Sequence, residues 1–368
     1  MARLGNFITV HNGKLDANAS SPNGIYPFFT CAVEPLRIDT YSYDCECVLV
    51  AGNGDLNVKY YNGKFDAYQR TYIIESKDKE VLTVPYLYCF LEQYVEVLRE
   101  QSIGGVIKYI KLGNLTEADI IIPSIEEQNR IVAIIKKARG IVSCRQKQLS
   151  ALDDLIKARF VEMFGDPIRN PMRWDTYQLD ECLERIDTGK SFVCSDKPRQ
   201  GIYPAVLKLS AATYGDYRPG ENKALLDESQ FVIGAEVHAG DLLFTRKNTP
   251  ELVGMAAYVQ ETPEKLMMPD LIFRLVTNER MSPIFLWQLI NCKEFRPVIQ
   301  GISGGSAKSM SNISKERLGK IRVICPPRKM QEQLEPFISQ IDESKSVIQK
   351  SLDETQLLFD SLMQENFG

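Results

Sequence analysis

Residues Pro123–Gly165 decide the fold of this chain, and they read PSIEEQNRIVAIIKKARGIVSCRQKQLSALDDLIKARFVEMFG. Ser124 and Glu127 form a capping box, in which two side chains pair with free backbone N–H groups at the start of a helix. Gly165, followed by Asp166-Pro167, is a strong stop signal. Between these signals the stretch predicts one helix over 124–165, on the order of 60 Å long.

This helix carries an apolar seam of the coiled-coil type. Apolar residues recur at alternating steps of four and three, the heptad spacing that favours two helices packing along their length. Arg145 and Arg159 interrupt the seam. Its apolar members are Ile131, Ile135, Ala138, Val142, Leu149, Leu152, Ile156 and Met163.

The same design returns in the last part of the chain, because residues 326–368 align with 123–165 without a gap. Two matching seams in one chain predict that the second helix, over 327–368, packs on the first. Identical pairs include Pro123/Pro326, Gln128/Gln331, Phe164/Phe367 and Gly165/Gly368. The second seam consists of Leu334, Ile338, Ile341, Ile348, Leu352, Phe359 and Leu362.

The regions before the two helices also repeat each other. Gly24-Ile-Tyr-Pro27 returns as Gly201-Ile-Tyr-Pro204, and a Gly-Lys pair precedes each of them at Gly13-Lys14 and Gly189-Lys190. Short strand-like runs separated by Gly, Asn and Pro loops indicate α+β modules. The chain is therefore predicted to be a tandem of two homologous mixed α/β domains, at 1–123 and 166–326, each followed by a long helix.

Composition sets limits on the class of protein. The chain has 368 residues, is 44% hydrophobic and 25% charged, and carries a net charge of −4, which is typical of a soluble globular protein of more than one domain. The charge does not indicate a general nucleic-acid binder, so any DNA contact must come from local basic loops. No long uncharged apolar run and no signal-peptide core occur, so we expect a cytoplasmic protein without membrane contact. The nine cysteines are scattered without a CxxC pair, and no metal site is predicted.

One group of residues resembles a catalytic site. Asp66 with Glu75 and Lys77 is similar to the metal site of many nucleases, where carboxylates hold Mg²⁺ and a lysine lies near the attacking water. The pattern is short and common, and the second half of the chain has no counterpart. Solvent-exposed charged residues at the end of a strand explain it better. Neither a phosphate-binding loop nor the base-holding loop of adenine methyltransferases is present. A DNA-cleaving nuclease therefore stays as an alternative, and no catalytic residue is assigned.

The loops of both halves suit contact with DNA. Gly-Gly-x-x-Lys motifs can bring backbone N–H groups and an ammonium group to phosphates. Arg246 and Asn248 could read base edges, since Arg favours guanine and Asn favours adenine. The candidates are Asn53, Asn57, Gly104, Gly105, Lys108 and Tyr109 in the first half, and Lys190, Arg246, Lys247, Asn248, Gly304, Gly305, Ser306, Lys308 and Ser309 in the second.

The motifs at the two ends of the helices resemble a known family. The run from Pro123 through Gln128 to Val132, and Phe160–Pro167 at the helix end, look like the central conserved region of type I restriction–modification specificity subunits. Pro326–Gly368 looks like their distal conserved region, so the resemblance extends over the whole chain.

The resemblance implies a fold and a function. The fold is α+β, with two target-recognition domains separated by two antiparallel coiled-coil helices in a pseudo-two-fold frame. Each domain would read one half of a bipartite site in double-stranded DNA, while the helices set the spacer and dock methyltransferase subunits. Those partners would bind S-adenosylmethionine and methylate adenine, and restriction subunits with motor and nuclease activity would join them. This chain would then hold no cofactor, no metal and no active site.

The resemblance also implies which helix residues contact partners. Conserved positions at the helix ends are expected to dock the methyltransferase subunits. They are Gln128, Arg130, Phe160, Phe164, Gln331 and Phe367. A coiled-coil adaptor without a DNA role remains as a second alternative to a specificity subunit.

Overall fold

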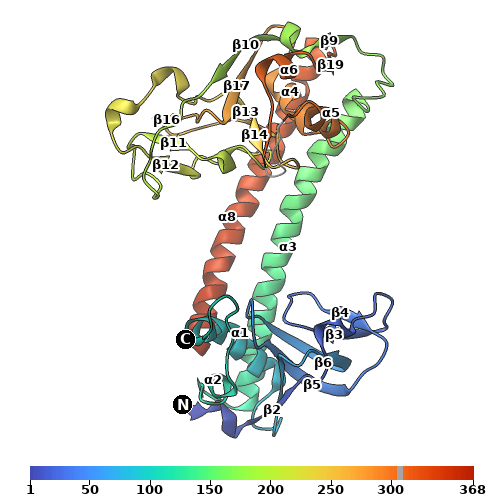
Figure 1. Ribbon diagram of the computed structural model, residues 1–368, viewed down its shortest axis with the longest axis vertical. Helices are drawn as coiled ribbons and strands as arrows, with labels where there is room; N and C mark the ends of the chain where they lie inside the picture. The colour runs from blue at the N-terminus through green and yellow to red at the C-terminus, as the bar shows by residue number, and fades with distance from the viewer. Residues whose placement is uncertain (305–309) are drawn as a thin grey trace. The chain divides into compact units, whose positions relative to one another are not determined.

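The computed structural model describes residues 1–304 and 310–368, and its contacts divide the chain into two compact units (Figure 1). The first unit consists of Met1–Gln148 and Ile348–Gly368, and the second of Leu149–Val347. We call residues 1–123 arm 1 and residues 166–326 arm 2. Each unit holds one arm together with one end of each long helix, α3 (Ile125–Phe164) and α8 (Leu334–Phe367). The expected mixed α/β fold with two long helices is confirmed.

A six-stranded sheet forms the body of arm 1, in the order β2-β7-β5-β6-β3-β4. Neighbouring strands are antiparallel except for the parallel pair β3 and β6. Strand β5 is covered on both faces, because Val48 and Val50 pack with helix α1 while Cys47 and Leu49 face a second cluster. The elements are β1 (Ala2–Arg3), β2 (Ile8–Asn12), β3 (Tyr26–Phe29), β4 (Leu36–Ile38), β5 (Tyr43–Ala51), β6 (Val58–Ala67), β7 (Thr71–Ser76), α1 (Val84–Gln101), α2 (Leu112–Thr116) and β8 (Asp119–Ile120).

Arm 2 is built on a four-stranded sheet, β10-β17-β13-β15, and a three-stranded sheet, β12-β11-β16. Two small ladders, β14-β18 and β19-β9, complete it. The strands are β9 (Thr176–Gln178), β10 (Leu183–Thr188), β11 (Ala205–Leu207), β12 (Asn222–Ala224), β13 (Leu242–Thr245), β14 (Lys247–Asn248), β15 (Ala256–Tyr258), β16 (Leu266–Met267), β17 (Ile272–Thr277), β18 (Ser311–Asn312) and β19 (Arg322–Ile324). The short helices are α4 (Pro283–Asn291), α5 (Arg296–Gly301), α6 (Lys315–Gly319) and α7 (Arg328–Glu332).

The two arms share one topology. The order β2-β7-β5-β6 of arm 1 returns as β10-β17-β13-β15 in arm 2, and the hairpin β3-β4 returns as β11-β12. Strand β6 is long enough to pair with both β5 and β3, and in arm 2 its two parts are separate strands, β15 and β16. The ladder β1-β8 corresponds to β9-β19. Strand pairing thus confirms the duplication that the sequence repeats indicate.

The repeated Gly-Lys pairs occupy equivalent places in this topology. A Cβ atom on Gly13 would lie 2.3 Å from the carbonyl oxygen of Ala67, and one on Gly189 would lie 2.2 Å from that of Met268. The next residue in each pair then donates its backbone N–H to the same carbonyl, over 3.1 Å for Lys14 and 3.0 Å for Lys190. Glycine is required at both positions because no side chain fits between the two backbones.

In the first unit, the start of α3 and the end of α8 complete the core of arm 1. Ile131 and Ile135 of α3 join Met363 of α8 in the cluster that contains helix α1. The ring of Phe367 lies 5.1 Å from that of Tyr86 on α1. At this end of α3 the seam is therefore buried against arm 1 and α8.

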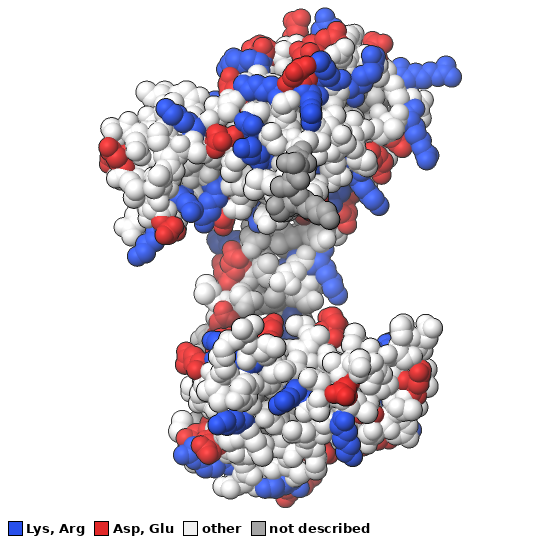
Figure 2. Space-filling view, viewed as in Figure 1, with Lys and Arg blue, Asp and Glu red and all other residues white. Residues whose placement is uncertain are grey.

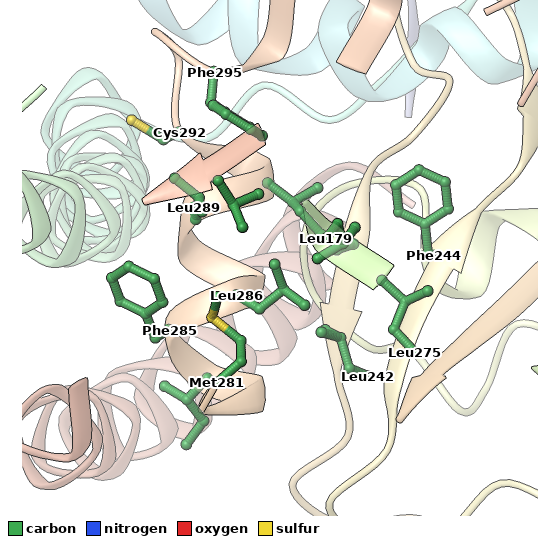
Figure 3. Close-up of a cluster of buried hydrophobic side chains, with 14 of the residues drawn as sticks. Leu179, Leu242, Phe244, Leu275, Met281, Phe285, Leu286, Leu289, Cys292 and Phe295 are labelled. Atoms are coloured by element: carbon green, nitrogen blue, oxygen red, sulfur yellow. The ribbon is translucent and has the colours of Figure 1, made fainter. Parts of the chain in front are cut away.

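In the second unit, the end of α3 and the start of α8 do the same for arm 2. Phe160 and Phe164 pack with Phe285 of α4 in a cluster that also contains Leu334 and Ile338 of α8. Figure 3 shows the part of this cluster that α4 contributes, with Phe285, Leu286 and Leu289 beside side chains of the sheet. Burial of these large aromatic side chains provides much of the stability of the second unit.

A buried glutamine joins each long-helix region to its arm. The Oε1 atom of Gln128 accepts hydrogen bonds from the backbone N–H of Thr83, at 2.9 Å, and from its hydroxyl, while Nε2 donates to the carbonyls of Val81 and Pro123. Thr83 is the N-cap of α1. Gln128 is fully buried, and its polar groups are satisfied within the unit.

Arm 2 repeats this arrangement with Gln331. Its Oε1 accepts from the backbone N–H of Ser282, the N-cap of α4, at 2.8 Å. Its Nε2 donates to the carbonyls of Arg280 and Pro326, at 2.9 and 2.7 Å. We call the two arrangements the glutamine clamps. They fix where each arm helix begins relative to the adjacent helical segment.

No helix among the described residues is long and apolar enough to cross a membrane.

The glutamine clamps predict a stability effect. Gln128→Ala and Gln331→Ala each leave several buried backbone groups without partners, and we expect each to cost about 3 kcal/mol. Circular dichroism melting curves of the purified chain would show this as a lower melting temperature. Gln146→Ala in α3 and Gln340→Ala in α8, both at exposed positions of the long helices, serve as controls. Equal melting curves for clamp and control variants would contradict the assignment.

Candidate nucleic-acid interface

The three residues of the nuclease alternative do not form a site. Asp66 is 1% exposed and accepts a hydrogen bond from the Ser42 hydroxyl at 2.8 Å. Lys77 donates its ammonium group to the carbonyl oxygens of Gly5 and Asn6 at 3.0 and 3.2 Å. The side chains of Asp66 and Lys77 are thus engaged in separate structural contacts.

Strand register explains why the acidic residues stay apart. Phe65, next to Asp66, pairs with Tyr43 of β5, whereas Ile74, next to Glu75, pairs with Val48 of the same strand. Five residues along a strand correspond to about 16 Å. Among the described residues, no group of three or more His, Cys, Asp or Glu side chains is placed to hold a metal ion. The nuclease alternative therefore finds no support in the geometry.

The structure does bring the DNA-contact candidates of arm 1 together. Residues 103–109 form a hairpin, in which Ile103 and Tyr109 exchange backbone hydrogen bonds of 3.0 and 2.8 Å. The hairpin is tied to the turn after β5, because Gly54 donates to the carbonyl of Lys108 at 2.9 Å and Asn53 forms a bridge with Tyr109. Gly104, Gly105, Lys108 and Tyr109 are all exposed on this hairpin.

Asn53 and Asn57 lie beside this hairpin and hold a neighbouring loop. The amide of Asn57 donates to the carbonyl of Cys31 at 2.8 Å, and the Cys31 thiol donates to Oδ1 of Asn53. Both amides are half-buried, so part of each side chain faces the loop and part faces solvent. Lys59 donates to Asn57, and burial lowers the pKa of its ammonium group.

In arm 2 the candidates Arg246 and Lys247 lie at the turn after β13, the strand equivalent to β5. The guanidinium of Arg246 donates from Nε and Nη2 to Oδ1 of Asn312, each at 3.3 Å, and lies 5.0 Å above the ring of Phe273. Lys247 pairs with Asn312 in the ladder β14-β18. Gly304 and Asn312 also exchange backbone hydrogen bonds of 2.8 and 2.9 Å. The turn after β13 and Gly304 are therefore both paired with Asn312, as the turn after β5 and the hairpin are joined in arm 1.

The side chain of Asn248 is buried, unlike those of the other candidates in this loop. Its side chain is 8% exposed and donates to the Thr213 hydroxyl at 3.1 Å, while Oδ1 accepts from the backbone N–H of Thr249. A buried amide with these partners holds the loop, so the structure does not support the prediction that Asn248 reads adenine. Gly305, Ser306, Lys308 and Ser309 lie outside the described residues.

Lys190 is exposed beside a hollow in arm 2. Its ammonium group lies 5.2 Å from the centre of the Phe192 ring. The hollow has a volume of about 280 Å³, and Ser191, Phe192, Lys208 and Lys223 are among the residues that line it. Lys14 is the equivalent of Lys190 in arm 1, with its ammonium group 5.7 Å from the ring of Tyr43.

Sequence reasoning missed several residues of this surface. Lys14 could have been found, since the Gly-Lys repeat already paired it with Lys190. No sequence motif pointed to Asn312, Lys208 or Lys223. Strand pairing, and not their spacing along the chain, brings them near the other candidates. On the face drawn in Figure 2, basic and acidic side chains are interspersed over both units. This agrees with the expectation that DNA contact depends on local loops.

Most of the helix residues expected to dock partners are buried. Gln128 and Gln331 are 0% exposed in the glutamine clamps, and Phe160 and Phe164 lie in the core of the second unit. The structure does not support the prediction that these four contact partners, because their side chains hold the arms. Phe367 is half-buried against arm 1, and Arg130 is exposed and paired with Glu127, so partner contact remains a prediction for these two.

With this geometry established, comparison with known proteins shows which class the chain resembles. Residues 1–152 match the family model described as the Type I restriction modification DNA specificity domain. This part of the chain, arm 1 with the first part of α3, is similar to that family. The resemblance seen in the sequence is thereby confirmed, and neither the nuclease nor the adaptor alternative is supported.

Two relatives from Escherichia coli point to particular members of the class. The chain is 37% identical over 154 residues to the specificity subunit of the type I restriction enzyme EcoDI, and 32% identical over 198 residues to that of EcoEI. These matches cover 42% and 52% of this chain but 34% and 33% of the relatives. The similarity thus spans about a third of each relative's length.

Solved structures extend the likeness of fold to the whole chain. The S subunit of a type I restriction–modification system from M. genitalium superposes with a TM-score of 0.63 at 14% identity, covering 100% of this chain and 95% of that one. A chain from a structure of the type I R-M system, solved for its complex assembly and conformational transition, gives a TM-score of 0.55 at 15% identity and covers 100% and 96%. At these identities the comparison establishes the fold.

The exposed hairpin of arm 1 yields a test of its predicted role. Lys108→Ala removes one ammonium group from a phosphate contact, so we expect weaker binding by a similar factor on target and non-target duplexes. Titrations over a range of salt concentrations should show the slope of log K against log salt reduced by about 1. Lys79→Ala, at a lysine paired with Glu46, is the control. An effect confined to the target sequence would contradict a phosphate contact.

Proposed function

We propose that this chain is the DNA-specificity subunit of a type I restriction–modification complex. The observation that carries the proposal is that one arm topology occurs twice, each time with polar and basic loops gathered at the turn after the same core strand. One copy, with the first part of α3, matches the family model of a DNA specificity domain. Two like arms suit a bipartite site in double-stranded DNA, with one arm for each half.

The loops of each arm combine two kinds of contact. Exposed lysines such as Lys108 and Lys190 provide the sequence-independent attraction to phosphates. Asn53 and Asn57, beside the hairpin that carries Lys108, and Arg246 in arm 2 have side chains that can hydrogen-bond base edges. Phosphate contacts would set the position of the arm, and the adjacent amides and guanidinium would select the sequence.

The long helices would set the spacer and carry the partner subunits. Their outward faces expose large apolar side chains although their seams are buried. Exposed apolar faces of this kind suit a stable protein contact, which we assign to methyltransferase subunits. The exposed residues are Ile134, Ile141, Leu155 and Val161 on α3, and Val347, Leu357 and Leu358 on α8.

Catalysis would belong to the partners. The methyltransferase subunits would bind S-adenosylmethionine and take the target adenine out of the duplex, since a base inside the stack cannot reach a methyl donor. Restriction subunits would add DNA cleavage. This chain would contribute the choice of site and would bind no cofactor of its own.

Methylation mapping tests the proposed function. We expect a neutral host that expresses this chain with its methyltransferase partner to gain methylated adenines in a split motif with a fixed spacer. Whole-genome sequencing that detects methylated adenine is the measurement, and the host expressing the methyltransferase alone is the control.

Two outcomes would contradict the proposal. The first is a folded complex that modifies no adenine. The second is Mg²⁺-dependent DNA cleavage by the purified chain alone that Lys77→Ala abolishes, which would restore the nuclease alternative.

A further inference from the structure

The hairpin of arm 1 carries an apolar group that the folded chain leaves in water. Val106 is fully exposed at 104% and Ile107 is 62% exposed, while Ile103 and Tyr109 on the same hairpin are about 40% exposed. Single exposed apolar residues are ordinary, but four on one seven-residue segment form a patch that a partner would cover.

The hairpin is held in place before any partner binds. Two backbone hydrogen bonds close it between Ile103 and Tyr109, and Ile110 donates to the carbonyl of Gly52 at 3.0 Å at its base. Gly104 has φ +120°, and a Cβ there would lie 2.5 Å from the carbonyl oxygen of Ile107. The turn therefore requires glycine, and the tip keeps a fixed position relative to β5.

The surroundings of the tip indicate what covers it. Lys108 is exposed directly beside Ile107, and the half-buried amides of Asn53 and Asn57 lie at the base of the hairpin. An apolar protein partner would have to bury these polar groups at a cost. DNA offers phosphates for the lysine and base edges for the amides, so the polar rim and the apolar tip suit one ligand.

Only one base edge in the major groove presents an apolar group, and it is the 5-methyl group of thymine. A two-stranded ribbon also fits the width of that groove. We propose that Val106 and Ile107 read a thymine in the half-site bound by arm 1, by packing against its 5-methyl group. This inference rests on the DNA-binding function proposed above and names a readout that hydrogen bonding does not provide.

Removal of the methyl group from the DNA is the direct test. Once the methylated motif is known, the complex of this chain with its methyltransferase is titrated with duplexes in which 2′-deoxyuridine replaces thymine in one half-site at a time. We expect the wild-type complex to bind about fourfold more weakly per contacted methyl at one half-site, the effect of losing one buried methyl group. Val106→Ser with Ile107→Ser should bind the thymine and uracil duplexes of that half-site equally.

A matched control is Ile25→Ser, at an apolar residue that is 70% exposed elsewhere in arm 1. It should keep the wild-type preference for thymine, and all variants should melt as the wild type does because the changed residues are exposed. A wild-type complex that ignores the methyl group at both half-sites, or a double variant that retains the preference, would overturn the proposal. Failure to bind any duplex would instead overturn the proposed function.

Discussion

The rest of the structure depends on the pairing of the apolar seams of α3 and α8. An apolar stripe on a helix is stable only when another surface covers it, and here each seam is covered by the other helix and by an arm. Ile131 and Ile135 belong to the core of arm 1 as much as to the helix, and Phe160 and Phe164 belong to that of arm 2. The glutamine clamps add directional contacts to this non-directional burial. The helices are therefore structural parts of both folding units and not linkers between them.

This arrangement separates the scaffold from the surface that we propose reads DNA. Strand order, clamps and Gly-Lys pairs are the same in both arms, whereas the loops after β5 and β13 carry different side chains. Arm 1 presents asparagines and an apolar hairpin, and arm 2 presents an arginine stacked on Phe273 and a hollow lined in part by Lys208 and Lys223. A fixed scaffold with variable loops allows two similar domains to select different sequences.

Much of the fold could be predicted from the sequence, because helix signals are local and the repeat is gapless. The capping residues and the seam located α3 to within a residue at each end. The strand order could not be predicted, since pairing such as that of β7 with β5 joins segments without any local signal. For the candidate site, the sequence indicated which loops would come together, but not which of their side chains would be exposed. Asn248 and Gln128 have side chains of the kind that contact DNA or partners. Both are buried in the structure, where they form hydrogen bonds that hold the fold. Burial depends on tertiary packing, which spacing along the chain does not reveal.

The central proposal is that the two long helices set the spacer between two DNA half-sites, and a change of helix length tests it most directly. One heptad that continues the seam would be inserted after Gln148 in α3 and another after Val347 in α8, and the methylated motif would be mapped. Seven helical residues add about 10 Å, the rise of about three base pairs. The account predicts unchanged half-sites and a spacer longer by about three base pairs. An unchanged spacer, or altered half-sites, would contradict it.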